Sequence, residues 1–217
     1  MTKDALKKNF WELSNLDKAV YLAFIRPFQP RSERIFFDGS FLLPGQMYKA
    51  ERKALYDIIR ETKPDYCFEI GTYTGGGSTF FISRGLRDNN KGKLITTESD
   101  GFLYNKAKDR YRKFIRSQFP FIDFVHGSST EAFKGRLMDA NKKILIFLDG
   151  AEDGEQTLEQ YEFFKPHMRS GSILALHDWN TEKTIRVKPV LTSDKSFTKL
   201  LELDKPDSVG FAVFRKN

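Results

Sequence analysis

Residues 66–81, with the sequence YCFEIGTYTGGGSTFF, constrain the fold of this 217-residue chain more than any other segment. The apolar first part stops at Gly71, three glycines follow at positions 75–77, and Ser78 begins a second apolar run. This pattern predicts a buried strand, a tight turn and the first turn of a helix. Glycine lets the backbone bend sharply and lets a ligand approach it without interference from Cβ atoms. Because the N–H groups of the new helix favour a polar or anionic group, the turn predicts a site for a nucleotide-like cofactor.

Five short apolar runs follow Pro64, and longer amphipathic segments separate them. The apolar runs cover residues 66–70, 93–97, 121–125, 144–148 and 172–176. The segments between them have helical spacing near residues 78–86, 103–118, 130–140 and 155–168. Strands that alternate with helices predict right-handed crossovers and a mostly parallel sheet that is covered on both faces.

The C-terminal part of the chain has a different pattern. Residues 197–203 and 209–214 have the composition of two strands, and Pro206 and Asp207 between them are typical of a turn. A hairpin of this kind would add antiparallel strands to the parallel sheet. The predicted fold is therefore α/β and Rossmann-like, a doubly wound, mostly parallel seven-stranded sheet with an antiparallel C-terminal hairpin.

Residues 1–62 carry no motif with evident chemistry and predict an N-terminal helical extension of the domain that covers residues 63–217. Apolar residues at helical spacing predict one or two helices before Pro27. A further helix is predicted over residues 46–61, with a buried face made by Ala50, Leu55, Ile58 and Ile59. This extension could cover the cofactor, shape a substrate pocket or contact a second copy in a homodimer, and the sequence leaves these alternatives open.

The composition is that of a globular protein without membrane-spanning segments. Hydrophobic residues make up 40% of the chain, and no apolar run approaches the roughly 18 residues that a span needs. Cys67 is the single cysteine, and the first residues lack the apolar stretch of a signal peptide, so we expect a cytoplasmic protein. The net charge is +7, but the basic residues are scattered among acids, so a nucleic-acid partner is not expected.

Polar and acidic residues follow every one of the five predicted parallel strands. They occupy residues 69–71, 98–100, 126–129, 149–153 and 177–180. Because ligands of open α/β sheets bind beyond the carboxyl ends of the strands, these residues are expected to surround one site.

Glu98, at the end of the second predicted strand, is a candidate for binding a ribose. A carboxylate at this place can accept hydrogen bonds from both ribose hydroxyls, and Asp100 is the second candidate. The glycine turn does not have the GxGxxG spacing, because three other residues separate Gly71 from the glycine triplet. This spacing disfavours a dehydrogenase that binds NAD.

The motifs together resemble the class I S-adenosylmethionine-dependent methyltransferases. The segment EIGTYTGGGST at residues 69–79 is similar to motif I of that family, and Glu98 corresponds to the acid that ends its second strand. The likeness continues with LDG at residues 148–150 and SGSILALHDW at residues 170–179, and covers roughly residues 46–217. The last two segments are most similar to the small-molecule O-methyltransferase branch, which includes catechol and macrocin O-methyltransferases.

The resemblance implies a set of residues for binding S-adenosyl-L-methionine. Glu69 would order the turn or meet the amino group of the cofactor, Glu98 would accept hydrogen bonds from the ribose, and Ser128 would face the adenine. The full implied set is Glu69, Gly71, Thr72, Tyr73, Gly75, Ser78, Thr79, Glu98, Ser128 and Asp149.

The resemblance also implies that the acceptor is a small molecule with a hydroxyl group, which must lose its proton. Asp149, His177 and Asp178 are the implied catalytic residues. In one alternative Asp149, Asp178 and Asn180 hold Mg²⁺, which lowers the pKa of the acceptor hydroxyl. In the other, His177 acts as a general base without a metal.

Three other functions stay open at this level. An RNA methyltransferase of the same fold would agree with the basic net charge, although no RNA-binding module is visible. An oxidoreductase that binds NAD on a Rossmann domain is disfavoured by the glycine spacing and by the closing hairpin. A protein that retains the fold without catalysis is the third alternative.

Overall fold

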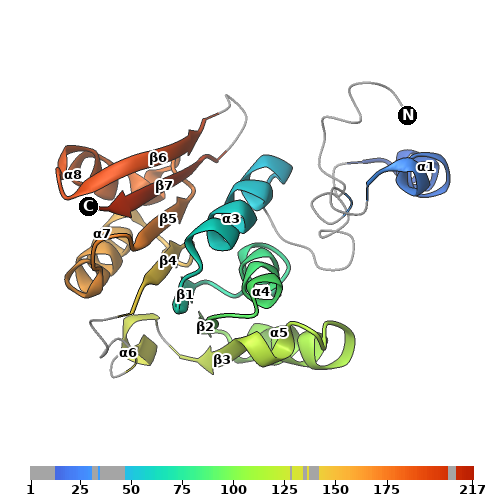
Figure 1. Cartoon of the computed structure of the whole chain (residues 1–217), viewed down its shortest axis with the longest axis horizontal. Helices are drawn as coiled ribbons and strands as arrows, with labels where there is room; N and C mark the ends of the chain where they lie inside the picture. The colour runs from blue at the N-terminus through green and yellow to red at the C-terminus, as the bar shows by residue number, and fades with distance from the viewer. Residues whose placement is uncertain are drawn as a thin grey trace.

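The computed structural model describes residues 13–30, 34, 47–127, 129–133, 136, 142–204 and 209–217 (Figure 1). The strands are β1 (Tyr66–Ile70), β2 (Lys93–Glu98), β3 (Ile122–His126), β4 (Ile144–Leu148), β5 (Ile173–His177), β6 (Phe197–Leu203) and β7 (Phe211–Lys216). The α-helices are α1 (Asn15–Val20), α3 (Lys49–Thr62), α4 (Ser78–Asn89), α5 (Gly101–Phe114), α6 (Ser129–Phe133), α7 (Gly154–Phe164) and α8 (Val187–Ser193). Shorter helical turns are η3 (Tyr21–Ile25), η4 (Arg26–Phe28), η5 (Phe119–Phe121), η6 (Lys165–His167) and η7 (Glu182–Thr184).

The described strands form one seven-stranded sheet in the order β3-β2-β1-β4-β5-β7-β6. β1 to β5 are parallel, and β7 pairs antiparallel with both β5 and β6. The predicted Rossmann-like fold with a C-terminal hairpin is therefore confirmed. The predicted bounds of β1, β4 and β6 are those observed, whereas β7 begins two residues later than predicted.

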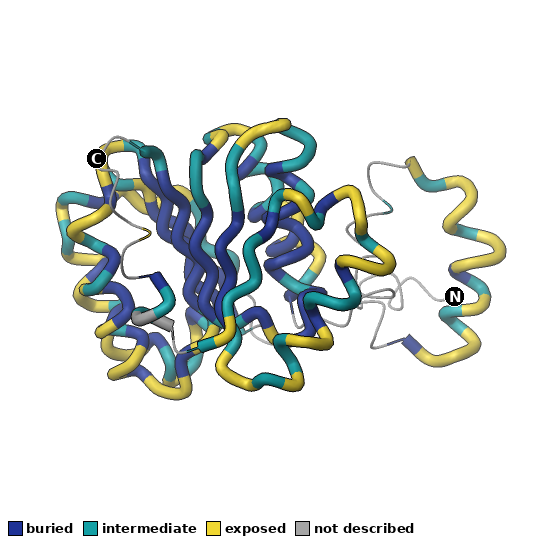
Figure 2. Tube along the Cα trace, turned by 90° about the horizontal axis from the view of Figure 1, so that it is seen from below, coloured by how far each residue is buried: buried dark blue, intermediate teal, exposed yellow. Residues whose placement is uncertain are grey.

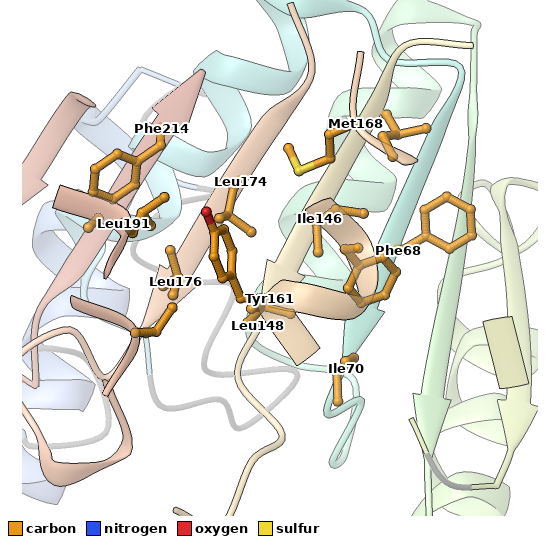
Figure 3. Packing of buried hydrophobic residues seen from close by; sticks show 14 of the residues in the cluster. Phe68, Ile70, Ile146, Leu148, Tyr161, Met168, Leu174, Leu176, Leu191 and Phe214 are labelled. Carbon is orange, nitrogen blue, oxygen red and sulfur yellow. The ribbon is translucent and has the colours of Figure 1, made fainter. Parts of the chain in front are cut away.

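The two faces of the sheet follow from the alternation of side chains along each strand. Cys67 of β1 belongs to the core that packs on α3, α4 and α5, and Phe68 and Ile70 belong to the core that packs on α6, α7 and α8. Figure 3 shows this second core between the sheet and α7, with Tyr161 of the helix among strand residues. Burial of each such side chain stabilises the fold by roughly 1.5–3 kcal/mol, so both faces fix the strand ends firmly.

The strand order reverses between β1 and β4, and this reversal creates the opening for a ligand. In the register of the sheet, Ile70 at the end of β1 lies beside Thr97 of β2 and beside Leu148 of β4. The three central strands therefore end at the same level, and the segments that follow them converge on one place.

Helix α3 packs beside α4 in the core on one face of the sheet, and its buried face differs from the predicted one. Glu51, Arg52, Leu55 and Ile59 are buried, whereas Ala50 is exposed. The Glu51 carboxylate accepts a hydrogen bond from the backbone N–H of Tyr48 at 2.7 Å and so caps the helix. Ala50 was predicted to be buried because apolar residues normally form the buried stripe of a helix. Glu51 is buried in its place, and its polar contacts compensate the cost of that burial.

Helices α1, η3 and η4 stand away from the sheet in Figures 1 and 2. They match the predicted helical segment before Pro27, and residues 1–12 and 35–46 lie outside the described residues. Of the helix predicted over residues 130–140, the structure describes α6 and Arg136. The described residues include no helix long and apolar enough to cross a membrane.

Candidate active site

A cavity of about 400 Å³ opens at the carboxyl ends of the parallel strands. This volume is within the range of small-molecule and cofactor sites. The β1 turn contributes Gly71, Thr72, Tyr73, Gly76, Gly77 and Ser78 to its wall, and the β2 end contributes Thr97, Glu98 and Ser99. The opposite wall is formed by Asp149, Gly150, Glu152, Gln156, Gln160, Asp178 and Lys183, and Met47, Ile70, Leu103 and Gly127 complete the lining.

The β1 turn needs glycine because it passes very close to the end of β4. Gly71 has φ of +97°, and a Cβ atom there would lie 3.0 Å from the Cα atom of Gly150. A Cβ atom on Gly150 would in turn lie 2.8 Å from the backbone nitrogen of Gly71. The glycine of the LDG segment is therefore explained by this mutual approach of two backbones.

The carboxylate of Glu98 is held at the rim of the cavity by two backbone N–H groups. Tyr73 donates to Oε2 at 2.7 Å and Asp100 donates to Oε1 at 3.0 Å. Tyr73 has φ of +50°, which costs free energy for a residue other than glycine, and its side chain is exposed. The turn and the β2 end are thus joined through Glu98, whose oxygens still have lone pairs for hydroxyl donors.

Glu69 lies beneath the turn and does not line the cavity. It is fully buried, and its Oε2 accepts hydrogen bonds from the hydroxyls of Thr79 at 2.7 Å and Thr96 at 2.6 Å. Burial raises the pKa of Glu69 to about 7, although these hydroxyl donors favour its charged form. Of the two roles that the sequence left open for Glu69, the geometry favours ordering of the turn.

Gly75 and Thr79, two further residues of the predicted cofactor site, do not line the cavity and instead pack beneath the β1 turn. Gly75 has φ of +74°, and a Cβ atom there would lie 2.8 Å from the ring of Tyr111. The hydroxyl of Tyr111 donates to the carbonyl oxygen of Gly75 at 2.7 Å. Thr79 is buried against Glu69. Gly71, Thr72, Tyr73, Ser78, Glu98 and Asp149 do line the cavity, and Ser128 lies outside the described residues.

Asp149, His177 and Asp178 form a cluster on the other side of the cavity, where β4 and β5 end. Nδ1 of His177 lies 3.1 Å from Oδ1 of Asp149 and 3.4 Å from Oδ1 of Asp178. One potential ligand atom from each of the three residues lies within 4.8 Å of the others. The three predicted catalytic residues are therefore brought together.

Glu51 of α3 completes this cluster, and the sequence analysis did not find it. Its Oε2 lies 3.4 Å from Nε2 of His177, and both side chains are nearly fully buried. Alternate residues of β5 face α3, which places the His177 ring on the side where Glu51 lies. Burial lowers the pKa of His177, but Asp149 and Glu51 more than offset this effect and raise the pKa to about 10. An imidazole that keeps its proton at neutral pH donates hydrogen bonds and is a poor general base.

Lys183 is the second residue that the sequence analysis missed. Its Nζ lies 2.9 Å from Oδ2 of Asp178, and it lines the cavity from the η7 turn. Asp178 has φ of +56°, a conformation that aspartate tolerates better than most residues. The strained backbone directs the Asp178 carboxylate toward both His177 and Lys183.

Asn180, the third predicted metal ligand, does not line the cavity and has other polar contacts. Its side-chain amide donates to Asp204 and accepts from Lys188 at 3.2 Å, on the side of the β6–β7 hairpin. The neighbouring Trp179 is buried, and its Nε1 donates to Glu202 at 2.8 Å. These contacts hold Asn180 beside the hairpin, and His177 is the residue whose potential ligand atom lies close to those of Asp149 and Asp178.

A second and much smaller cavity lies next to this cluster. Its volume is about 10 Å³, close to that of one water-sized sphere. Asp149, Gln160, His177, Asp178 and Lys183 are among the residues that line it. Gln160 of α7 is 5% exposed, and its Oε1 has no hydrogen-bond partner among the described residues. A buried amide oxygen without a hydrogen-bond partner favours the binding of a ligand that donates a hydrogen bond to it, or the binding of a cation.

Solved structures with this arrangement of helices and strands include several methyltransferases. The O-methyltransferase TomG from Streptomyces achromogenes, in complex with S-adenosylmethionine, has a TM-score of 0.66, 15% identity and coverage of 100% of both chains. The O-methyltransferase from Bacillus cereus, in complex with S-adenosylhomocysteine, has a TM-score of 0.65, 16% identity and coverage of 96% of this chain and 100% of that chain. The S-adenosylhomocysteine-bound methyltransferase PaMTH1 from Podospora anserina has a TM-score of 0.63, 16% identity and coverage of 94% and 97%. At these identities the likeness shows a shared fold.

The sequence itself also matches a known family. The family described as "Methyltransferase domain" matches residues 68–179, which is more than half of the chain. The matched segment begins in β1 and ends just after β5, so it contains the glycine turn, Glu98 and the cluster at Asp149. A search of curated proteins gives no significant match. The chain belongs to this methyltransferase-domain family.

Proposed function

We propose that the protein transfers a methyl group from S-adenosyl-L-methionine to a hydroxyl group of a small molecule. The observation that carries this proposal is the cavity of about 400 Å³ at the point where the strand order reverses. One side of it has the glycine turn and Glu98, and the other side has Asp149 and Asp178. Family membership and the S-adenosyl ligands named for TomG and the Bacillus cereus enzyme support the choice of cofactor.

The cofactor would lie along the β1 turn and the end of β2. Gly71, Gly76 and Gly77 leave the backbone accessible for the methionine part, and Ser78 begins a helix whose first N–H groups attract a carboxylate. Glu98 would accept hydrogen bonds from the ribose hydroxyls, because its carboxylate is fixed at the cavity rim by backbone donors. The sulfonium methyl would then point toward the β4 and β5 ends.

The acceptor would bind on the β4–β5 side, where the wall of the cavity is polar. Glu152, Gln156, Gln160 and Lys183 lie around Asp178 in this wall. In the transfer, the sulfur–methyl bond breaks as the oxygen–methyl bond forms, and the hydroxyl proton is released. Positioning of the two reactants in line supplies much of the catalysis, because the reaction needs little covalent help.

The residues on this side fit a divalent cation. Asp149, His177 and Asp178 would hold it, because their ligand atoms converge beside a cavity of the size of one ion or water. A cation bound there would lower the pKa of the acceptor hydroxyl. Without a cation His177 is a poor general base, since Asp149 and Glu51 keep its proton in place, and a bound cation would displace the Nδ1 proton.

Ligand binding tests the proposal before any acceptor is known. Calorimetry and thermal denaturation would be measured with S-adenosylmethionine, S-adenosylhomocysteine and NAD. A ligand at about 100 times its dissociation constant should add about 2.7 kcal/mol to the free energy of unfolding. We expect this stabilisation from both S-adenosyl compounds and none from NAD, and the reverse result would refute the proposal.

Transfer of tritiated methyl groups to a panel of acceptors tests the acceptor class. The panel would contain sugars, phenols and hydroxylated polyketides, with tRNA as a comparison. Label in a hydroxylated small molecule supports the proposal. Label in tRNA alone would favour the RNA methyltransferase alternative.

A further inference from the structure

We propose that the cation site of this chain contains one imidazole nitrogen and two carboxylates, and that it therefore selects a transition-metal ion over Mg²⁺. Glu51 of the N-terminal extension would hold the imidazole in place from behind. This inference deepens the proposed function and rests on its acceptor side. It assigns a positioning role to Glu51 and a new ligand, His177, to the place that Asn180 does not fill.

The first argument is the geometry of the ligand atoms. Nδ1 of His177 lies 3.1 Å from Oδ1 of Asp149 and 3.4 Å from Oδ1 of Asp178. These distances are close to those between neighbouring ligand atoms around one ion with bonds of about 2.0–2.2 Å. The side chains come from the ends of two adjacent strands, so the sheet itself fixes their separation.

The second argument is independent of the acidic residues. Gln160 comes from α7 on the opposite face of the sheet, is 5% exposed, and lines the cavity of about 10 Å³ beside the cluster. Its Oε1 has no hydrogen-bond partner among the described residues. An amide oxygen accepts from a water bound to a metal or binds a metal directly, so a hydrated ion in this cavity would satisfy it.

Glu51 gives the histidine the environment of a metal ligand. Its Oε2 lies 3.4 Å from Nε2 of His177, and both groups are nearly fully buried. A metal that binds at Nδ1 would displace the Nδ1 proton, because a ligand imidazole is neutral, and the Glu51 carboxylate would keep the other proton on Nε2. Lys183 has the corresponding place behind Asp178, since its Nζ contacts Oδ2 and leaves Oδ1 on the side of His177.

The kind of donor decides which ion is favoured. Mg²⁺ prefers oxygen ligands and keeps several waters, whereas imidazole suits Zn²⁺, Fe²⁺ and Ni²⁺, and carboxylates also suit Mn²⁺. In a site with one nitrogen and two carboxylates, the imidazole nitrogen therefore favours a transition metal, and the two carboxylates balance the charge of the divalent ion. Replacement of the nitrogen by a third carboxylate should return the preference to Mg²⁺.

The test is metal binding by the full chain after removal of bound metal with a chelator. Equilibrium dialysis and calorimetry with Mn²⁺, Zn²⁺ and Mg²⁺ measure the dissociation constants, and pulsed electron paramagnetic resonance of bound Mn²⁺ detects a coordinated nitrogen. We expect one site for each chain, at least tenfold tighter for Mn²⁺ or Zn²⁺ than for Mg²⁺, and a histidine nitrogen coupling in the wild type. Equal affinities, or bound Mn²⁺ without a nitrogen coupling, would overturn the inference.

Variants separate the roles of the residues. His177→Asp should abolish the nitrogen coupling and shift the preference toward Mg²⁺, while Glu51→Gln should weaken Mn²⁺ binding about 10–100-fold. Glu61→Gln, which changes an exposed acid of the same helix, is the matched control and should leave Mn²⁺ affinity unchanged. An equal effect of the two glutamine variants would contradict the role of Glu51.

Titration of S-adenosylhomocysteine in parallel distinguishes this inference from the proposed function. Binding of S-adenosylhomocysteine without the expected metal selectivity would refute the inference and leave methyl transfer in place. Loss of S-adenosylhomocysteine binding by the wild type would refute the proposed function itself.

Discussion

On the β1–β2 side of the cavity the backbone forms much of the surface, whereas on the β4–β5 side long polar side chains form it. The first side uses glycines and N–H groups of the β1 turn, and Glu98 is fixed there by the backbone N–H groups of Tyr73, 25 residues earlier in the chain, and of Asp100. The second side joins β4, β5, α7 and the N-terminal helix α3, and its central contact connects Glu51 with His177, 126 residues apart.

The first side is therefore formed largely by the backbone of one turn, whereas the second depends on side chains that the complete fold brings together. A cofactor that is the same in every methyl transfer can be met by a fixed backbone shape. An acceptor that differs between enzymes is met by side chains, which can change without disturbing the sheet. The following predictions test whether the two sides are as separate as their construction indicates.

The largest effect is expected for Gly71→Ala. The alanine would have to adopt φ of +97°, which is unfavourable for an L-residue, and its Cβ atom would lie 3.0 Å from the Gly150 Cα atom. We expect a loss of about 3 kcal/mol in the free energy of unfolding, together with loss of S-adenosylhomocysteine binding. Chemical denaturation and calorimetry measure the two effects.

Gly171→Ala is the matched control for that substitution. Gly171 also has a positive φ, of +83°, but a Cβ atom there would meet nothing closer than 3.8 Å. Its substitution should cost about 1 kcal/mol and leave the affinity for S-adenosylhomocysteine unchanged. Equal destabilisation by the two variants would show that backbone strain, and not the approach of β1 to β4, makes Gly71 necessary.

Glu69→Gln should change the pH dependence of stability. Burial raises the folded-state pKa of Glu69 from 4.5 to about 7, so the folded protein binds this proton more tightly than the unfolded chain. The contribution of Glu69 is therefore lost as the pH rises from about 4.5 through 7, by about 3 kcal/mol in total. Denaturation at pH 5 and pH 8 should show that the variant gains relative to the wild type at the higher pH. Parallel pH profiles would contradict this assignment.

A smaller effect is expected for Tyr111→Phe, which removes the support of the turn by α5. The Tyr111 hydroxyl donates to the Gly75 carbonyl at 2.7 Å, and both groups are buried. Its loss should cost about 1–2 kcal/mol of stability and weaken S-adenosylhomocysteine binding only a few fold. Denaturation and calorimetry again measure both quantities. A change in metal affinity would contradict the separation of the two sides of the cavity, because α5 contacts the β1 turn on the β1–β2 side.

The cofactor side could be predicted from the sequence because its geometry depends on spacing along the chain. The bounds of β1, the turn at Gly71 and the position of Glu98 all follow from apolar runs and from the residues between them. The pattern did not show that Gly75 packs on Tyr111 or that Glu69 lies beneath the turn, because both contacts involve residues distant in the sequence.

The acceptor side could be predicted only in part. Asp149, His177 and Asp178 lie at strand ends and were found, whereas Asn180, which was predicted to join them, has contacts with Asp204 and Lys188. Glu51 was missed because charged residues of a helix are normally exposed. A signal was present, since Glu51 lies four residues before Leu55 and eight before Ile59, on the buried stripe of α3.

The central claim is that the β1–β2 side binds the cofactor and the β4–β5 side prepares the acceptor. The most direct test is calorimetric titration of S-adenosylhomocysteine into the wild type, Glu98→Ala and Asp178→Asn. We predict one binding site in the wild type, affinity at least about tenfold weaker in Glu98→Ala because two charge-assisted hydrogen bonds are lost, and a change of less than about threefold in Asp178→Asn. No binding to the wild type, or an equal loss in both variants, would contradict the account.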